Sequence, residues 1–410
     1  MTTRSSGQGP GFIEFVGFMA LTVSIVALSI DAMLPSLPEI AEELQAPTPN
    51  DRQLVVSVFI LGMSVSPVLF GLAADAHGRR PAMIAGLWIF AAGCVVSATA
   101  ASFETMLLGR FLQGVGAAGP RTLAVTVVRD RYEGRAMAQV MSFIMTIFIL
   151  VPALAPSLGL LVESLSGWRA VFVVLLSLSG LIFVWISLRL PETLVEQDRR
   201  PLRWRTVSSG LGRIFRDRTA MGYTLATGFA FAPFLAYLSA SEQILADRYG
   251  WGDGFVLVFG GLALVIGAAA FVNAHAVMKL GMRRLTGVAQ LSLMGCSTVA
   301  AAVFAVLGSP SFAVFLVWMI PAMFFSGILF GNVNALAMQP LGAMAGLGAA
   351  LVGSLSNALS VPIGIGIARA YDGEPTPLAI GFAVCAACSW LCARWAESGQ
   401  SAISLREDAA

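Results

Sequence analysis

The residues best suited to chemistry in this sequence are charged side chains inside long apolar stretches. Asp31 and Arg110 each lie about six residues from one end of such a stretch, so an ion pair between them at similar depth is feasible. Arg121 follows Arg110 by 11 residues, close to three helical turns, which puts both guanidinium groups on one helix face. Because a charge in hydrocarbon is costly unless paired or hydrated, these residues predict a water-filled cavity.

Asp31 is the candidate for reversible proton binding. Burial favours the protonated carboxyl and a neighbouring guanidinium favours the carboxylate, so proton occupancy would change as the cavity opens and closes. Arg110 cannot be the titrating partner, because guanidinium stays protonated. Glu242 is the reserve candidate for protonation. The simpler interpretations stay open: Asp31 and Glu242 as interfacial carboxylates, and Arg121 as a side chain that reaches towards the interface.

Amide side chains inside other apolar stretches are the further candidates for contacting a substrate, together with Arg121. They are Gln113, Asn332, Asn334 and Asn357. The charge of Arg121 favours neutral or anionic ligands over cations. The five cysteines lie in apolar runs without a neighbouring histidine, so we interpret them as packing residues and expect no metal site. With no nucleotide-binding loop and no nucleophile–base pair, we expect neither a cofactor nor an enzyme.

The composition requires a membrane environment. The chain has 410 residues, of which 57% are hydrophobic and only 12% are charged. Soluble domains average about 25% charged residues, so this chain has too few to cover a water-facing surface. The net charge of +2 gives no bulk attraction to nucleic acid.

Twelve apolar segments are long enough to cross a bilayer, which needs roughly 20 residues each. They cover 15–37, 53–74, 82–101, 105–127, 138–163, 169–189, 219–244, 254–278, 284–307, 312–337, 347–370 and 376–396. The polar, basic stretch 190–218 divides the chain into an N-terminal six-helix bundle (1–189) and a C-terminal one (219–410). We expect 190–218 to be a cytoplasmic linker with a short surface helix that includes Trp204.

The loops predict the orientation of the chain. Nineteen Arg and Lys residues fall in one set of loops and the terminal segments, against four in the opposite set. The positive-inside rule therefore puts both termini in the cytoplasm. The two halves also repeat weakly, since Gly78-Arg79-Arg80 recurs 203 residues later as Gly281-Met282-Arg283-Arg284. Paired six-helix repeats are typical of secondary transporters.

Several motifs carry a resemblance to a known family. The loop between spans 2 and 3 holds Gly71, Asp75, Gly78, Arg79 and Arg80, span 4 holds Arg110 with Gln113, and span 5 holds Pro152, Pro156 and Gly159. These segments resemble the loop, span 4 and antiporter signatures of the major facilitator superfamily. With Ser29-Ile30-Asp31 and Val128-Arg129-Asp130, they are similar to the Bcr/CflA-type drug-resistance exporters.

The resemblance implies an all-α membrane protein with the major facilitator fold. It implies export of drugs or small metabolites by proton antiport across the bacterial inner membrane, by a protein embedded in lipid that we expect to be a monomer. The loop motif would form an inner gate in which Asp75 faces the start of span 11 near Gly346–Gly348 and Arg79 pairs with Asp130. The prolines of span 5 would mark an antiporter. A symporter that imports a nutrient is the main alternative, and a receptor or an intramembrane enzyme is a weaker one.

Overall fold

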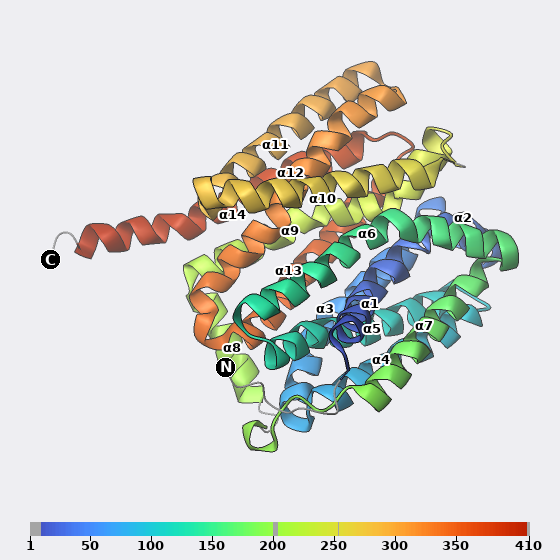
Figure 1. Cartoon of the computed structure of the whole chain (residues 1–410). Helices are drawn as coiled ribbons and strands as arrows, with labels where there is room; N and C mark the ends of the chain where they lie inside the picture. Colours follow the sequence, from blue (N-terminus) through green and yellow to red (C-terminus); the bar gives the residue numbers. More distant parts are fainter. Residues whose placement is uncertain (1–9, 200–203, 253, 408–410) are drawn as a thin grey trace.

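The computed structural model describes residues 10–199, 204–252 and 254–407, and long helices make up most of this part of the chain (Figure 1). The long helices are α1 (Phe12–Asp31), α3 (Leu54–His77), α4 (Arg79–Ala98), α5 (Phe103–Arg131), α6 (Gly134–Ser166), α7 (Trp168–Arg189), α9 (Arg218–Glu242), α10 (Phe255–Leu280), α11 (Met282–Leu307), α12 (Phe312–Met338), α13 (Ala345–Arg369) and α14 (Thr376–Glu407).

In the described part of the chain, eleven helices are long and apolar enough to span a membrane. α5 does not meet this criterion, because Arg110, Gln113 and Arg121 lower its hydropathy. It is nevertheless an interior helix that packs against α3 and α4. At Gly114 a Cβ atom would come within 1.9 Å of the Phe59 carbonyl oxygen of α3, so only glycine allows this approach. The predicted count of twelve spans stays a prediction.

The long helices form two groups. In the first, α3 and α4 pack on α5, α7 packs on α4, and α1 packs on α6; in the second, α12, α13 and α14 pack on α9, and α11 packs on α14. The main contacts between the groups are α3 with α13 and α6 with α10. α3, α6, α10 and α13 are the second, fifth, eighth and eleventh predicted spans. The sequence repeat relates the second span to the eighth and the fifth to the eleventh, so the two contacts between the groups are equivalent.

Short elements mark the two ends of the bundle. α2 (Leu37–Glu43) and the 3-10 helix η2 (Pro49–Gln53) connect α1 to α3, and we call their side the α2 end. The opposite side, which includes α8 (Trp204–Arg216), is the α8 end (Figure 1). α8 lies within the stretch predicted to be the linker, and its Val207 and Ile214 pack into an apolar cluster with residues of α9 and α13. Residues 200–203 and the side chain of Trp204 lie outside the described part.

Candidate functional site

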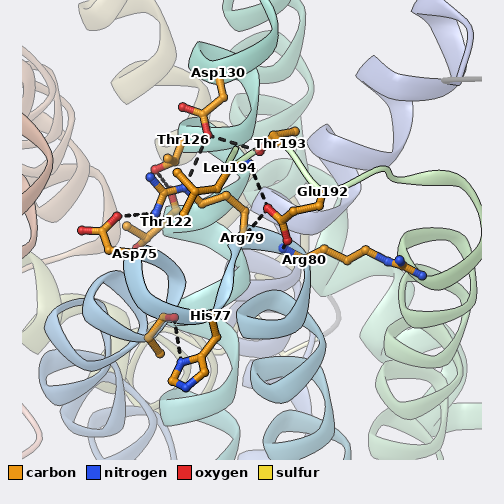
Figure 2. Close-up of polar contacts among 11 residues, drawn as sticks. Asp75, His77, Arg79, Arg80, Thr122, Thr126, Asp130, Glu192, Thr193 and Leu194 are labelled. Carbon is orange, nitrogen blue, oxygen red and sulfur yellow. Dashed lines mark hydrogen bonds and ion pairs between the residues drawn. The ribbon is translucent and has the colours of Figure 1, made fainter. Parts of the chain in front are cut away.

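The turn between α3 and α4 at the α8 end holds the first cluster of predicted site residues (Figure 2). Gly78 joins the helices with φ at +110°, a backbone conformation that L side chains rarely adopt. The carboxylate of Glu192 lies against this turn and accepts hydrogen bonds from the backbone N–H groups of Arg79 (2.8 Å) and Arg80 (3.1 Å). A carboxylate at this position satisfies the free donors at the N-terminus of α4 and interacts favourably with the helix dipole.

The Arg79 side chain connects this turn to α5. Its guanidinium pairs with Asp75 one turn earlier, and its Nε lies 3.4 Å from Oδ2 of Asp130 (Figure 2). The Thr193 hydroxyl donates a second hydrogen bond to Asp130, at 3.2 Å. Arg80 donates to the Ser187 carbonyl oxygen of α7. The motif therefore ties together α3, α4, α5 and the start of the linker within one half of the protein.

Asp75 makes its recorded ion pair inside its own half, and its side chain is about half exposed. In the predicted partner region Gly346–Gly348, Gly348 of α13 lies close to Leu341 and Met338. The side chains of 342–346 lie outside the described part. A latch between Asp75 and the start of α13 stays a prediction. Gly71 has open space beside it, so no close contact accounts for a glycine there.

Arg110 is fully buried in the first helix group and bonds to backbone rather than to Asp31. It donates to the carbonyl oxygens of Val55 (2.9 Å) and Ser29 (2.9 Å) and to Oε1 of Gln113 (2.7 Å). Its guanidinium also stacks over the Phe59 ring at 4.6 Å. The expected Arg110–Asp31 ion pair is absent from the contacts of the described residues, because backbone oxygens occupy the guanidinium donors. Arg110 joins α1, α3 and α5 and does not line an open cavity.

Asp31 ends α1 and is 4% exposed. Within the described residues no side chain donates a hydrogen bond to its carboxylate. The other half contributes Tyr237 of α9, which is also buried. The Tyr237 hydroxyl is buried and has no hydrogen-bond partner among the described residues. Asp31 is thus a buried carboxyl without a compensating cation among the described residues, and Tyr237 is a buried hydroxyl without a partner among them in the opposite half.

Glu242 also lies at this interface, at the α2 end. Its Oε2 is 3.3 Å from Nη1 of Arg52 in η2, and both residues are buried. The Arg52 guanidinium pairs in addition with Asp247. One arginine of the first half is therefore held by two carboxylates of the second half, the buried Glu242 and the exposed Asp247.

Further polar contacts join the two halves near this ion pair. Arg369 donates to Asp51 at 2.7 Å, and Gln53 donates to Gln243. The Ser57 and Ser239 hydroxyls are 3.1 Å apart. Asn50 donates to the Tyr371 carbonyl oxygen at 2.9 Å. The two halves are closed against each other at the α2 end by polar groups.

The residues predicted to contact a substrate differ in burial and in the partners they contact. Arg121 is partly exposed and lies 5.7 Å from the Phe148 ring of α6. Asn332 is buried and exchanges hydrogen bonds with Asn273 of α10 (2.7 and 3.2 Å), whereas Asn334 is exposed. Gln113 is buried and is bonded to Arg110 and to the Cys94 sulfur, and Asn357 is partly exposed. Arg121 and Asn357 keep accessible polar groups, while Gln113 and Asn332 are used inside their own halves.

The predicted antiporter residues lie on α6, where they allow close packing. Pro152 and Pro156 are inside the helix. At Gly159 a Cβ atom would lie 1.9 Å from the Ala32 carbonyl oxygen, directly after Asp31. Six residues before Gly159, Ala153 packs against Gly260 of α10 in the other half. α6 therefore contacts both the segment that carries Asp31 and the opposite half.

Three participants were not predicted from the sequence: Glu192, Arg52 and Tyr237. Glu192 occurs in Pro191-Glu192-Thr193, directly after an apolar segment, and this acidic residue in a basic stretch was the available signal. Arg52 was counted only as a loop charge. Tyr237 is an aromatic residue in an apolar segment, and nothing in one sequence distinguishes it from a packing residue.

Comparisons with known proteins agree with this architecture. The sequence profile of the Major Facilitator Superfamily matches residues 19–365. An uncharacterized MFS-type transporter, YdgK, from Bacillus subtilis is 30% identical over 331 residues, covering 80% of this chain and 82% of that protein. A bicyclomycin resistance protein homolog from Haemophilus influenzae is 26% identical over 379 residues, covering 90% and 94%.

A solved structure shares the fold. The crystal structure of a D-xylose-proton symporter superposes with a TM-score of 0.73 over 94% of this chain and 97% of that one. The two sequences are 13% identical, so this likeness concerns the fold alone.

Proposed function

Because the chain belongs to the major facilitator superfamily of membrane transporters, we propose that it exports drugs or small metabolites across the bacterial inner membrane in exchange for protons. Export is supported by the relative that is named a bicyclomycin resistance protein homolog and by the antiporter-like prolines Pro152 and Pro156. Members of this family are transporters and not enzymes.

The observation that carries proton coupling is the environment of Asp31. A buried carboxyl without a cationic partner favours the protonated form, and it becomes ionised when water or a donor reaches it. Tyr237, which belongs to the other half, moves relative to Asp31 whenever the halves rock. Proton affinity at Asp31 is therefore coupled to the conformational cycle. Because Arg110 is held by backbone oxygens, it orders the helices around Asp31 and does not neutralise it.

Glu242 has a different part in this scheme. Its partner Arg52 comes from the opposite half, so this pair holds the α2 end closed. Opening that end must separate the ion pair and hydrate both charges. Protonation of Glu242 from the outside would weaken the contact and favour opening.

The test is efflux driven by an imposed pH gradient in proteoliposomes. We expect Asp31→Asn to abolish gradient-driven efflux while substrate still binds and the protein stays folded. Tyr237→Phe should keep transport but change its pH dependence, because the buried hydroxyl that could donate to Asp31 as the halves move is lost. Full gradient-driven efflux by Asp31→Asn would exclude Asp31 as the coupling site and leave Glu242 as the candidate.

Import of a nutrient by symport is the alternative, and a receptor without transport activity is a weaker one. Drug accumulation in cells with and without the protein distinguishes export from import. An exporter lowers accumulation, and an uncoupler removes the difference. Flux in liposomes distinguishes either transporter from a receptor.

We further propose that 1–189 and 219–410 move as two units joined by the cytoplasmic linker 190–218, with both termini in the cytoplasm and the protein active as a monomer. A single cysteine introduced at 194–210, in a background without native cysteines, should resist impermeant thiol reagents added from outside. One introduced near Pro47 should be labelled. The reverse labelling pattern would show that both termini lie outside the cytoplasm.

A further inference from the structure

A polar pocket of about 480 Å³ lies at the α8 end of the second helix group, where α9, α11 and α14 meet. Arg283 and Arg284 from the first turn of α11 line it, together with Arg394 and Glu397 of α14. It belongs to neither the Asp31 site nor the contacts between the halves. Its charges therefore need an explanation of their own.

The pocket has an excess of positive charge. Three guanidinium groups share it with one carboxylate, Glu397, which accepts a hydrogen bond from the Tyr223 hydroxyl at 2.7 Å. Across the described residues, none of the recorded ion pairs includes Arg283, Arg284 or Arg394. The pocket therefore has more positive charges than the protein supplies acidic groups to neutralise them.

The equivalent turn in the first half is neutralised by the chain itself. There Arg79 pairs with Asp75, four residues earlier, and with Asp130, while Glu192 caps the helix. In the second half, with Gly281 aligned to Gly78, Met278 and Met282 stand at the positions of Asp75 and Arg79, so the equivalent ion pair is missing. Positive-inside topology accounts for arginines at this end in both halves, but not for the loss of their acidic partners in one half.

Two further features of the pocket point to a ligand. The Thr286 hydroxyl, on the pocket lining, is buried and has no hydrogen-bond partner among the described residues, although Thr286 is only 1% exposed. An unsatisfied buried polar group is costly, so a native site normally supplies a partner. The lining also includes Val288 and Leu291, which are exposed on the outside of α11. The pocket thus joins a cationic region to an apolar surface that faces lipid.

We propose that this pocket binds the phosphate group of an anionic phospholipid. Guanidinium forks match phosphate oxygens in geometry and charge. A lipid headgroup reaches the ends of membrane helices without leaving the bilayer, and its acyl chains would lie along Val288 and Leu291. Trp390, whose ring is 5.6 Å from the Arg394 guanidinium, is an amphipathic residue typical of the interface. Inorganic phosphate shares the headgroup chemistry, so the experiment must separate the two sources.

The first experiment measures lipid binding to the purified full-length protein in detergent by native mass spectrometry. Wild-type protein should retain phosphatidylglycerol in preference to phosphatidylcholine. Arg283→Gln/Arg284→Gln should weaken phosphatidylglycerol binding by about fivefold per arginine, or about 25-fold for the pair. The matched control is Arg129→Gln/Arg135→Gln, which removes two exposed charges at the same end but outside the pocket.

The control variant should bind phosphatidylglycerol as the wild type does. Equal loss in both double variants, or equal binding of the two lipids by wild-type protein, would overturn the proposal. Thr286→Val tests the pocket without a change of charge. It should weaken lipid binding while the melting temperature of the lipid-free protein is kept or raised, because an unsatisfied hydroxyl is removed.

Inorganic phosphate identifies the source of the anion. If the ligand is a lipid, millimolar phosphate should neither displace phosphatidylglycerol nor raise the melting temperature. If phosphate does both, and Arg283→Gln/Arg284→Gln abolishes both effects, the phosphate site stands and the lipid assignment is overturned.

Discussion

Glu192 provides the N-cap of α4 from a position more than a hundred residues further along the chain. The helix starts directly after Gly78, which has no side chain to cap it. A Cβ atom at Gly78 would lie 2.3 Å from the Glu192 carboxylate, so the glycine also makes room for the cap. The arginine motif and the beginning of the linker are therefore one structural unit.

Neutralising this cap should loosen the motif. Glu192→Gln keeps the shape and one acceptor oxygen but removes the charge that faces the N-terminus of α4. We expect a loss of about 1 kcal/mol in unfolding free energy, seen as a lower melting temperature, and reduced efflux. Glu196→Gln is the control, since Glu196 is largely exposed in the same linker and its one ion pair among the described residues, with Arg199, is 3.9 Å long. If both changes have equal effects, Glu192 does not stabilise α4 as its N-terminal cap.

Arg121 should select substrates by charge. It is partly exposed, lies against Phe148 and is in none of the ion pairs of the described residues, so its positive charge repels cationic ligands. Arg121→Gln should therefore shift the preference towards cations while expression and melting temperature stay close to those of the wild type. Efflux assays with matched cationic, neutral and anionic substrates measure this. If cationic dyes are the best substrates of the wild type, the idea fails.

At the scale of the helix, the apolar pattern of the sequence predicts most of the fold. The predicted segment 169–189 matches α7 (Trp168–Arg189) closely, because apolar length directly reports a membrane crossing. The predicted segment 15–37 extends beyond α1, since the chain turns at Ala32 and continues as short helices up to α2. Pro35 and Pro38 are the signal for that turn, but the residues around them are apolar enough to extend the predicted segment to residue 37.

The partners in the candidate site were less predictable than the helices. The family resemblance implied that Arg79 pairs with Asp130, so their proximity was expected. Arg52 and Glu242, in contrast, are separated by 190 residues and belong to different halves. Only the packed fold brings them together. The same holds for Asp31, whose depth suggested Arg110 as a partner, whereas the carbonyl oxygens of Val55 and Ser29 take those donors.

The crossing of α1 and α6 depends on the absence of a side chain at Gly159. Gly159→Ala would put a methyl group 1.9 Å from the Ala32 carbonyl oxygen, so the helices must separate. We expect a loss of about 1–3 kcal/mol in stability and a larger loss of coupled efflux, because Asp31 is displaced. Gly180→Ala in α7, where a Cβ atom meets nothing within 4 Å, is the control and should be neutral. Wild-type efflux and melting temperature for Gly159→Ala would contradict the close crossing.

At the scale of the whole molecule, the two ends of the interface between the halves differ in chemistry. The α2 end is closed by ion pairs and hydrogen bonds such as Arg52–Glu242 and Arg369–Asp51. Towards the α8 end, Val68 and Leu72 of α3 pack on an apolar cluster that includes Val207 and Leu351. Polar contacts are directional and are lost as a set when the halves rotate, whereas apolar surfaces tolerate sliding. We therefore expect the α2 end to open and close in one cooperative step, and the α8 end to change more gradually.

A disulfide across the α2 end should arrest transport. The hydroxyl oxygens of Ser57 on α3 and Ser239 on α9 are 3.1 Å apart, so cysteines at both positions are close enough to react. We expect Ser57→Cys/Ser239→Cys, in a background without the five native cysteines, to form an intramolecular disulfide under mild oxidation. Efflux should then fall to background, because a covalent bond holds the halves together where they must separate.

The reducing agent supplies the decisive comparison. Reduction should restore efflux in the same preparation, which separates a blocked cycle from misfolding. Each single variant, Ser57→Cys or Ser239→Cys, loses the same hydroxyl and should transport under both conditions. Binding should also persist in the oxidised double variant, because substrate still enters from the α8 end. If the cross-linked protein transports at the wild-type rate, the contacts at the α2 end are a static part of the fold, and the ion pair of Arg52 and Glu242 does not gate the pathway.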